Sequence, residues 1–146
     1  MLLNIYMSSA SSNLVFVKEN VEWKEFYIHN IVYDHGIIDI PKLIDYNHVT
    51  KTLTMQKIPQ MSIADMYGDD PQNLPPTLWT AIREILVKLT EIGIHYPDIT
   101  PYNFIEHGDK VWIIDFGHAS ICTKYAPDHF MLQFINGHNG WNEEFR

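Results

Sequence analysis

The chain has 146 residues, 46% of them hydrophobic, which fits one domain or one compact two-lobed unit with a sizeable core. Its formal net charge of −8, with ten Lys and Arg residues that form no cluster, argues against direct nucleic-acid binding. The single cysteine, Cys122, excludes an internal disulfide, and no apolar run reaches the ~20 residues of a membrane span, so we expect an intracellular, cytoplasmic protein.

The first segment is predicted to be a β-hairpin. Two β-prone runs, Leu2–Met7 and Leu14–Lys18, flank a connection of small residues, Ser8–Asn13. The second run ends on Lys18. A lysine at a strand end is commonly a solvated surface residue, so a role in binding depends on what lies near it.

A helix is predicted over Val21–Asp34, with Gly36 just beyond it as a stop signal. Its apolar face carries four residues at helical spacing: Val21, Glu25, Ile28 and Val32. A carboxylate on such a face needs a partner, because burying it unpaired is costly. Lys18 is the natural partner of Glu25, and Glu22 is the competing choice.

Two further strands are predicted over Ile40–Asn47 and Lys51–Lys57, and the alternation of polar and apolar residues in Thr50–Met55 suits a half-exposed sheet. With the first hairpin they form a small sheet of four or five strands carrying one helix. The segment Gln56–Met61 then leaves this sheet.

The second half is predicted to begin with a short helix, Ile63–Tyr67, capped by Ser62. A loop rich in proline, Gly68–Pro76, precedes the strongest helical pattern, Thr77–Ile92. Its apolar stripe indicates core packing, so this helix is expected to support the loop that follows.

Three polar residues in the region 96–119 are suited to chemistry. Asp98 and Asn103 lie five apart in a loop that contains proline, and Asp115 follows a predicted hairpin with strands at 104–106 and 111–114. The Gly108-Asp109 pair is a hairpin turn signal. Because a hairpin returns the chain to its start, Asp115 is expected beside Asn103. A carboxylate and an amide oxygen are ligands that Mg²⁺ takes when a phosphate supplies the others.

This region resembles the catalytic core of the protein-kinase-like superfamily. The family pattern is D-[LI]-x-P-x-N, an apolar hairpin, then D-F-G, and here Asp98–Asn103 reads DITPYN and Asp115–Gly117 reads DFG. The resemblance covers roughly Leu14–Ala119 and is most specific from Ile94 on. It implies an α+β, bilobal fold, with an N-lobe at 1–57, a hinge at 58–61 and a reduced, mostly helical C-lobe at 62–146.

The resemblance also implies ATP and Mg²⁺ as cofactors and a role for each site residue. Asp98 would orient the attacking hydroxyl or water and accept its proton, and Asn103 and Asp115 would hold Mg²⁺. Lys18, positioned by Glu25, would bind the phosphates. The hinge would meet the adenine at Gln56 and Ile58, with Met55, Ile58 and Met61 as apolar candidates for lining the pocket.

Some positions depart from the family pattern. The first hairpin contains no glycine, whereas kinases cover the phosphates with a Gly-rich loop. Tyr96 stands where family members commonly have histidine, and Thr100 stands where typical Ser/Thr kinases have lysine. The threonine resembles small atypical kinases, including the kinase-ATPase of the KEOPS complex.

The segment after Gly117 has 29 residues and no Ala-Pro-Glu signature. One helix is predicted over Asp128–Asn136, followed by a turn whose Trp141 packs back on the domain. This ending resembles short kinase-like domains of fungi and giant viruses. A self-dimer or a protein partner is therefore expected to complete the substrate platform.

Two function hypotheses follow from the sequence. One is a minimal Mg·ATP-dependent phosphotransferase acting on a protein, on its own serines or on a small molecule, with an ATPase as a variant. The other is a pseudokinase that serves as a binding or regulatory module, favoured by the missing glycines and the altered position of His95. An unrelated α+β domain is the remaining alternative.

Overall fold

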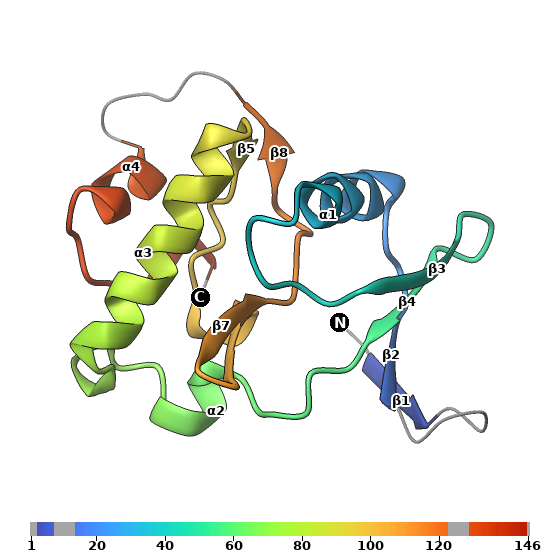
Figure 1. The fold of residues 1–146 in the computed structure, drawn as a ribbon, viewed down its shortest axis with the longest axis horizontal. Coiled ribbons are helices and arrows are strands. Elements are labelled where there is room, and N and C mark those ends of the chain that lie inside the picture. The colour runs from blue at the N-terminus through green and yellow to red at the C-terminus, as the bar shows by residue number, and fades with distance from the viewer. Residues whose placement is uncertain (1–2, 8–13, 123–128, 146) are drawn as a thin grey trace.

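The computed structural model describes residues 3–7, 14–122 and 129–145 (Figure 1). One half contains β1 (Leu3–Met7), β2 (Leu14–Lys18), α1 (Trp23–His35), β3 (Leu43–Asn47) and β4 (Thr52–Gln56). The other half contains α2 (Ile63–Tyr67), α3 (Pro76–Glu91), β5 (Ile94–His95), β6 (Phe104–His107), β7 (Lys110–Ile113), β8 (Ser120–Ile121) and α4 (Phe130–Ile135). Short 3₁₀ turns lie at Pro71–Asn73, Pro101–Asn103 and Glu143–Phe145.

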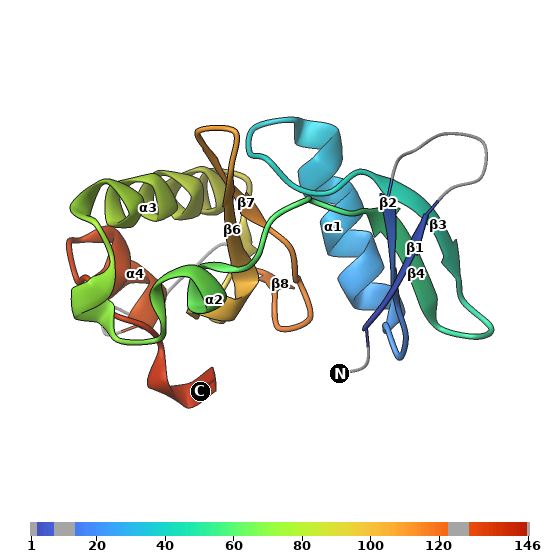
Figure 2. The ribbon, with the colours of Figure 1, turned by 90° about the horizontal axis from the view of Figure 1, so that it is seen from below.

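The two halves lie side by side and are joined by the segment between β4 and α2 (Figure 2). The predicted hinge, residues 58–61, lies in this segment. The hairpin β6–β7 and the chain that follows it lie between α3 and the sheet half, on the side of the helical half that faces the sheet half. This arrangement is an α+β fold with a small sheet lobe and a mostly helical lobe.

The sheet is antiparallel with the strand order β1-β2-β4-β3. Lys18 pairs with Leu53 and Phe16 pairs with Met55, so alternate residues of β2 and β4 share one face. On that face Leu53 and Met55 are buried with Val21. The prediction of a four- or five-stranded sheet with one helix is confirmed. The connection Ser8–Asn13 lies outside the described residues.

The helix α1 begins two residues later than predicted. Val21 precedes it, and its backbone N–H donates to the carbonyl of Lys51 at 2.9 Å, which ties the approach to α1 to the sheet. Gly36 ends the helix with φ 64°, a conformation that glycine adopts at little cost. The face buried by α1 includes Glu25, as predicted, and also His29.

The helix α3 supports the second half. The prolines at 75 and 76 start it, since proline suits the first helical turn, where no backbone donor is needed. The residues of its apolar stripe are buried: Leu78, Trp79, Ile82, Ile85, Leu86 and Leu89. Trp141 packs against Trp79 with ring centroids 4.5 Å apart, so the prediction that it packs back is confirmed.

The hairpin β6–β7 turns at Gly108 and Asp109, which have φ of 62° and 60°. Positive φ at both central residues is the geometry of a type I′ turn, which matches strand twist. The strands pair in register from Phe104–Ile113 to His107–Lys110. The turn chemistry therefore returns the chain to the loop from which it left, as predicted.

Some features were not predicted or differ from prediction. The short pair β5–β8 joins the chain before residues 96–103, the loop that resembles the catalytic loop of kinases, to the chain after Gly117, a pairing with no local sequence signal. The helix α4 begins at Phe130 rather than at Asp128, which lies outside the described residues. No helix within the described ranges has both the length and the hydropathy that crossing a membrane requires.

Candidate active site

Lys18, Glu25 and Asp115 come together between the two halves. Lys18 Nζ makes a short hydrogen-bonded ion pair with Glu25 Oε2 and lies 3.1 Å from Asp115 Oδ1. The exposed fractions of the Lys18 and Glu25 side chains are 4% and 9%, so water screens their interaction weakly. The strand β2, the helix α1 and the end of the hairpin thus each supply one charged group.

The competing choice for the partner of Lys18 is excluded by geometry. Glu22 precedes α1 and pairs with Lys51 at 2.9 Å on the surface. Burial raises the pKa of Glu25, the Lys18 ammonium opposes that rise, and Asp115 adds to it. Lys18 therefore favours the ionised form of Glu25 inside the protein.

Asp98 lies in the loop between β5 and β6 and is partly buried. Its Oδ1 accepts a hydrogen bond from the Thr100 hydroxyl at 3.2 Å, and its Oδ2 lies 3.9 Å from Nε2 of the exposed His118. Burial raises the pKa of Asp98, while the side chains of Asn103, His118 and Thr100 act in the opposite direction. A carboxylate with a raised pKa that keeps access to solvent suits the acceptance of a proton.

Asn103 joins the loop to the hairpin. Its side-chain Nδ2 donates to the backbone carbonyl of Asp98 at 3.0 Å. Its backbone carbonyl accepts from the backbone N–H of Ile114 at 3.1 Å. Asn103 is thereby held next to the strand end that carries Asp115. Because the amide nitrogen is engaged in the loop, the amide oxygen is the atom suited to bind a cation.

The residues fit a magnesium site that is completed by phosphate. Asp115 supplies a carboxylate, whose Oδ1 also accepts from the backbone N–H of Gly117 at 2.8 Å. A Cβ on Gly117 would lie 3.0 Å from Asp115 Oδ1 and 3.3 Å from Glu25 Oε1, so glycine leaves room around both carboxylates. Hard oxygen donors from few protein groups are typical of Mg²⁺ sites in which a nucleotide is bound.

Tyr96 is a site residue that sequence reasoning recorded only as a departure from the pattern. It is 1% exposed, and its hydroxyl donates to the backbone carbonyl of Asp115 in a short hydrogen bond. Its ring also meets Phe116 edge-on at 5.7 Å. Burial holds the pKa of Tyr96 well above its usual range, so it stays a neutral donor linking the catalytic loop to Asp115.

His29 is a second residue that the sequence analysis did not single out. It is fully buried on α1, its Nε2 bonds the carbonyl of Pro41 at 2.8 Å, and its ring lies 5.1 Å from that of Phe116. Burial lowers the pKa of His29 to about 4, so the ring is neutral near pH 7. It packs α1 against the Asp-Phe-Gly segment without adding charge.

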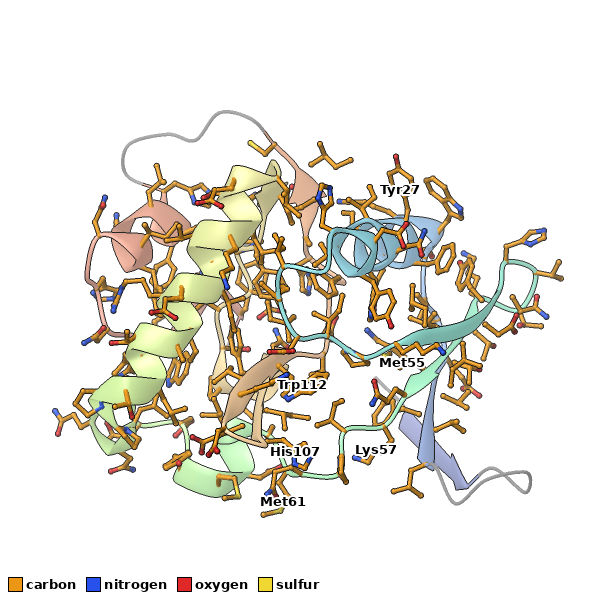
Figure 3. All side chains as sticks on the ribbon, in the orientation of Figure 1. Tyr27, Met55, Lys57, Met61, His107 and Trp112 are labelled. Atoms are coloured by element: carbon orange, nitrogen blue, oxygen red, sulfur yellow. The ribbon has the colours of Figure 1, made fainter. Side chains whose placement is uncertain are left out.

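A small apolar cavity lies where the sequence placed the adenine. It is lined by Phe16, Pro41, Met55, Gln56, Lys57, Ile58, Ile105 and Ile114. The two residues predicted to meet the adenine, Gln56 and Ile58, both border it. The expectation for Met61 is wrong: its side chain is 53% exposed and lies away from Met55 (Figure 3), because the chain has already turned toward α2.

Phe16 is the unexpected member of this lining. In the kinase pattern V-A-I-K the lysine is preceded two places earlier by alanine, and here Phe16 holds that position relative to Lys18. Lys57 lies over its ring, 5.2 Å from the centroid. The cavity volume is only about 40 Å³, room for a few water molecules. Alignment of Val15–Lys18 with V-A-I-K places Phe16 at the alanine position, and this sequence signal could have identified it as a lining residue.

The lysine strand differs in order from that of protein kinases. Lys18 lies on β2, directly after the connection from β1, whereas the corresponding lysine of protein kinases lies on their third strand. The connection Ser8–Asn13 therefore does not correspond in chain order to the Gly-rich loop, and its lack of glycine carries no argument against phosphate binding.

The fold is similar to those of solved kinases. A Rio2 kinase from Chaetomium thermophilum, solved as an ADP/Mg²⁺-phosphoaspartate complex, matches with a TM-score of 0.67 and 13% identity over 92% of this chain. The Rad53 kinase domain matches with a TM-score of 0.54 and 17% identity over 82% of this chain. Each alignment covers 49% of the solved chain, so this chain spans about half the length of each.

Curated relatives match over a shorter region. A 3-deoxy-D-manno-octulosonic acid kinase of Haemophilus influenzae strain KW20 is 29% identical over 69 residues, and that of strain PittGG is 30% identical. These matches cover 44% of this chain and 27% of each relative. The expectation of an atypical kinase-like domain is confirmed. The model of the RIO domain matches residues 5–132, and the chain therefore belongs to the RIO-domain family of atypical protein-kinase-like proteins.

Proposed function

We propose that this protein is a Mg·ATP-dependent phosphotransferase. The proposal rests on one observation: Lys18 contacts both Glu25 and Asp115, next to the loop that carries Asp98 and Asn103. A buried lysine paired to two carboxylates from separate elements has little structural purpose, since such groups cost free energy to bury. In a site for a nucleoside triphosphate each group has a use: Lys18 for the phosphates, Glu25 to orient Lys18, and Asp115 for Mg²⁺.

Each residue contributes to one displacement. Asp98 orients an acceptor hydroxyl and takes its proton as the acceptor oxygen forms a bond to the γ-phosphorus of ATP, while the bond to the β,γ-bridging oxygen breaks and ADP leaves. Lys18 binds phosphate oxygens, and Glu25 fixes its direction. Asn103 and Asp115 would hold Mg²⁺, which supplies neutralisation of the phosphate charge when bound. Positioning and charge neutralisation provide most of the catalysis of this reaction class.

The acceptor carries a hydroxyl in this proposal. Curated relatives are kinases of 3-deoxy-D-manno-octulosonic acid, which supports a small molecule as one acceptor class, and a protein hydroxyl is the other. A protein partner or a second copy of the chain that completes the acceptor side is part of the proposal. Water as acceptor would give an ATPase at the same site.

A non-catalytic binding module is the second candidate. The observation that favours it is the Phe16 ring in the wall of a cavity that has only about 40 Å³. A closed adenine pocket would leave the charged residues without a nucleotide. Binding of Mg·ATP in solution therefore separates the two candidates.

The decisive experiment is a thermal-shift titration with ATP and Mg²⁺ on wild type and on Asp115→Ala. A ligand at a hundred times its Kd adds about 2.7 kcal/mol to the stability of the folded state, so the melting temperature rises. We expect a Mg²⁺-dependent rise of several degrees in wild type that is lost in Asp115→Ala. The matched control, Asp45→Ala, removes an exposed carboxylate from β3 and should keep the full shift. No shift in wild type at millimolar ATP contradicts the enzyme.

The Phe16 ring is expected to limit the size of the nucleotide base that the cavity accepts. Phe16→Ala should enlarge the cavity and allow a bulky analogue such as N6-benzyl-ATP to raise the melting temperature, whereas wild type should respond to ATP alone. Val17→Ala, on the opposite face of β2, is the control and should leave this selectivity unchanged. Equal responses of wild type and Phe16→Ala to the bulky analogue contradict the assignment.

A further inference from the structure

The C-terminal segment Trp141–Phe145 contacts the catalytic loop on the side away from the sheet. Asn142 in this segment is 5% exposed although it is polar. Its backbone N–H donates to the carbonyl of Ile99 at 2.8 Å, and its side-chain Nδ2 donates to the carbonyl of Pro97 at 2.8 Å. One residue thus binds the backbone immediately before and immediately after Asp98.

These bonds complete the hydrogen bonding of the loop. The carbonyl of Asp98 itself accepts from Asn103 Nδ2 at 3.0 Å and from the N–H of Thr100 at 3.0 Å. Three successive carbonyls are therefore engaged, two of them by Asn142. The peptide planes on either side of Asp98 carry the carbonyls of Pro97 and Asp98, and together they set the direction of the Asp98 Cα–Cβ bond. Asn142 holds the first plane through Pro97, Asn103 holds the second, and the Asn142 N–H holds the next plane through Ile99. Asn142 therefore helps to set where the Asp98 carboxylate points.

The segment that carries Asn142 is itself firmly anchored. Trp141 is 3% exposed and packs on Trp79 of α3. Arg83 of the same helix contacts the chain before this segment, at the Phe134 carbonyl (2.8 Å from Nε) and at Asn139, and these contacts are separate from the packing of Trp141. A group held by a rigid support can transmit that rigidity to the loop it binds.

A second contact reaches the other side of the site. The ring of Phe145 lies 4.9 Å from that of His118, which is the histidine 3.9 Å from Asp98 Oδ2. The Asn142 side-chain Oδ1 accepts from the N–H of Glu144 at 3.2 Å, which shapes the turn that brings Phe145 to His118. The segment therefore touches both loops that border Asp98.

We infer that Asn142 is a positioning residue for Asp98, and that the segment Trp141–Phe145 is an integral part of the active site. This inference rests on the proposed function, in which Asp98 accepts the proton. A substitution of Asn142 removes its side-chain bond to Pro97, keeps its backbone bond to Ile99, and leaves Lys18, Glu25 and Asp115 in place. The consequence is a defect in the chemical step that exceeds any defect in nucleotide binding.

The test compares Asn142→Ala and Asn142→Asp with wild type, by steady-state ADP formation and by the melting temperature with and without Mg·ATP. The aspartate variant keeps the side-chain shape and the bond from Glu144 but loses the donor to Pro97, so it serves if the alanine variant does not fold. We expect kcat to fall about 10- to 100-fold, since misplacement by about 1 Å costs up to 10²-fold, with a smaller change in KM for ATP and a retained Mg·ATP shift.

The matched control is Asn139→Ala, which removes the Arg83 contact just before the segment and leaves both Asn142 bonds to the catalytic loop. It should keep kcat. Wild-type kcat in folded Asn142 variants, measured well below their melting temperatures, overturns the inference. So does an equal loss in Asn139→Ala, which would indicate general stability rather than positioning.

Hydrogen exchange separates a failure of this inference from a failure of the proposed function, because it does not require activity. The amide protons of Ile99 and Thr100 bond within the loop, to Pro97 and Asp98. We expect both to exchange faster in Asn142→Ala than in Asn139→Ala. Unchanged exchange overturns the positioning role. The proposed function is overturned instead if wild type is inactive and shows no Mg·ATP shift, while exchange is still faster in Asn142→Ala than in Asn139→Ala.

Discussion

Replacement of Asp98 by asparagine should lower kcat about 10²- to 10⁴-fold, the range that a positioned general base contributes. The amide cannot take the proton of the acceptor, but it keeps the size of the side chain and can still meet the Thr100 hydroxyl. Lys18, Glu25 and Asp115 are untouched, so the Mg·ATP thermal shift should persist. Steady-state ADP formation and the melting temperature check both parts.

The pH dependence supplies an independent check on Asp98. Because burial raises its pKa, the acidic limb of kcat/KM should lie at a higher pH than an exposed aspartate would give. Activity should fall as the pH drops through that value, since the protonated acid cannot accept a proton. Asp39→Asn, which removes a carboxylate paired with Lys110 elsewhere on the surface, should keep the wild-type profile. Full kcat in Asp98→Asn would show that another group is the base.

Replacement of Lys18 by methionine should lower the free energy of unfolding by about 3–5 kcal/mol, the usual cost of leaving one member of a buried ion pair without its partner. Both Glu25 and Asp115 lose their cation in this variant. Nucleotide binding should also be lost, because the phosphates lose a positive charge. Urea unfolding at pH 7.5 and the Mg·ATP thermal shift measure the two effects.

The sign of the pH effect follows from Glu25. Burial and Asp115 raise its pKa and Lys18 opposes them, so removing Lys18 raises that pKa further. The folded variant then binds more protons than the unfolded chain, and its stability falls as the pH rises through the raised pKa of Glu25. The deficit should therefore be smaller at pH 5 than at pH 8. Adding Glu25→Gln should remove most of this pH dependence.

The exposed pair Lys51–Glu22 is the matched control. Its side chains are 51% and 72% exposed, and Lys51→Met should change the free energy of unfolding little, since water and salt screen such pairs. Equal losses in Lys18→Met and Lys51→Met would contradict the view that burial sets the cost. An unchanged Mg·ATP shift in Lys18→Met would contradict the phosphate-binding role of Lys18.

Elements with strong local signals were predictable from the sequence. The α3 helix follows from its apolar stripe and its prolines, and the β6–β7 hairpin follows from Gly108-Asp109. The kinase-like fold followed from the two motifs at Asp98–Asn103 and Asp115–Gly117. The predicted start of α1 was wrong because of a distant contact: the Val21 N–H donates to the carbonyl of Lys51 in the turn between β3 and β4.

The fold class, the motifs at Asp98–Asn103 and Asp115–Gly117 and the placing of Asp115 beside Asn103 could all be predicted, because capping, periodicity and turn preferences act within a few residues along the chain. Three other features depend on tertiary contacts: Glu25 rather than Glu22 meets Lys18, Phe16 lines the small apolar cavity while Met61 is exposed, and Tyr96 and Asn142 bond the backbone at Asp115 and Pro97. Those outcomes depend on which segments pack together and exclude water, and packing joins residues that no local pattern relates.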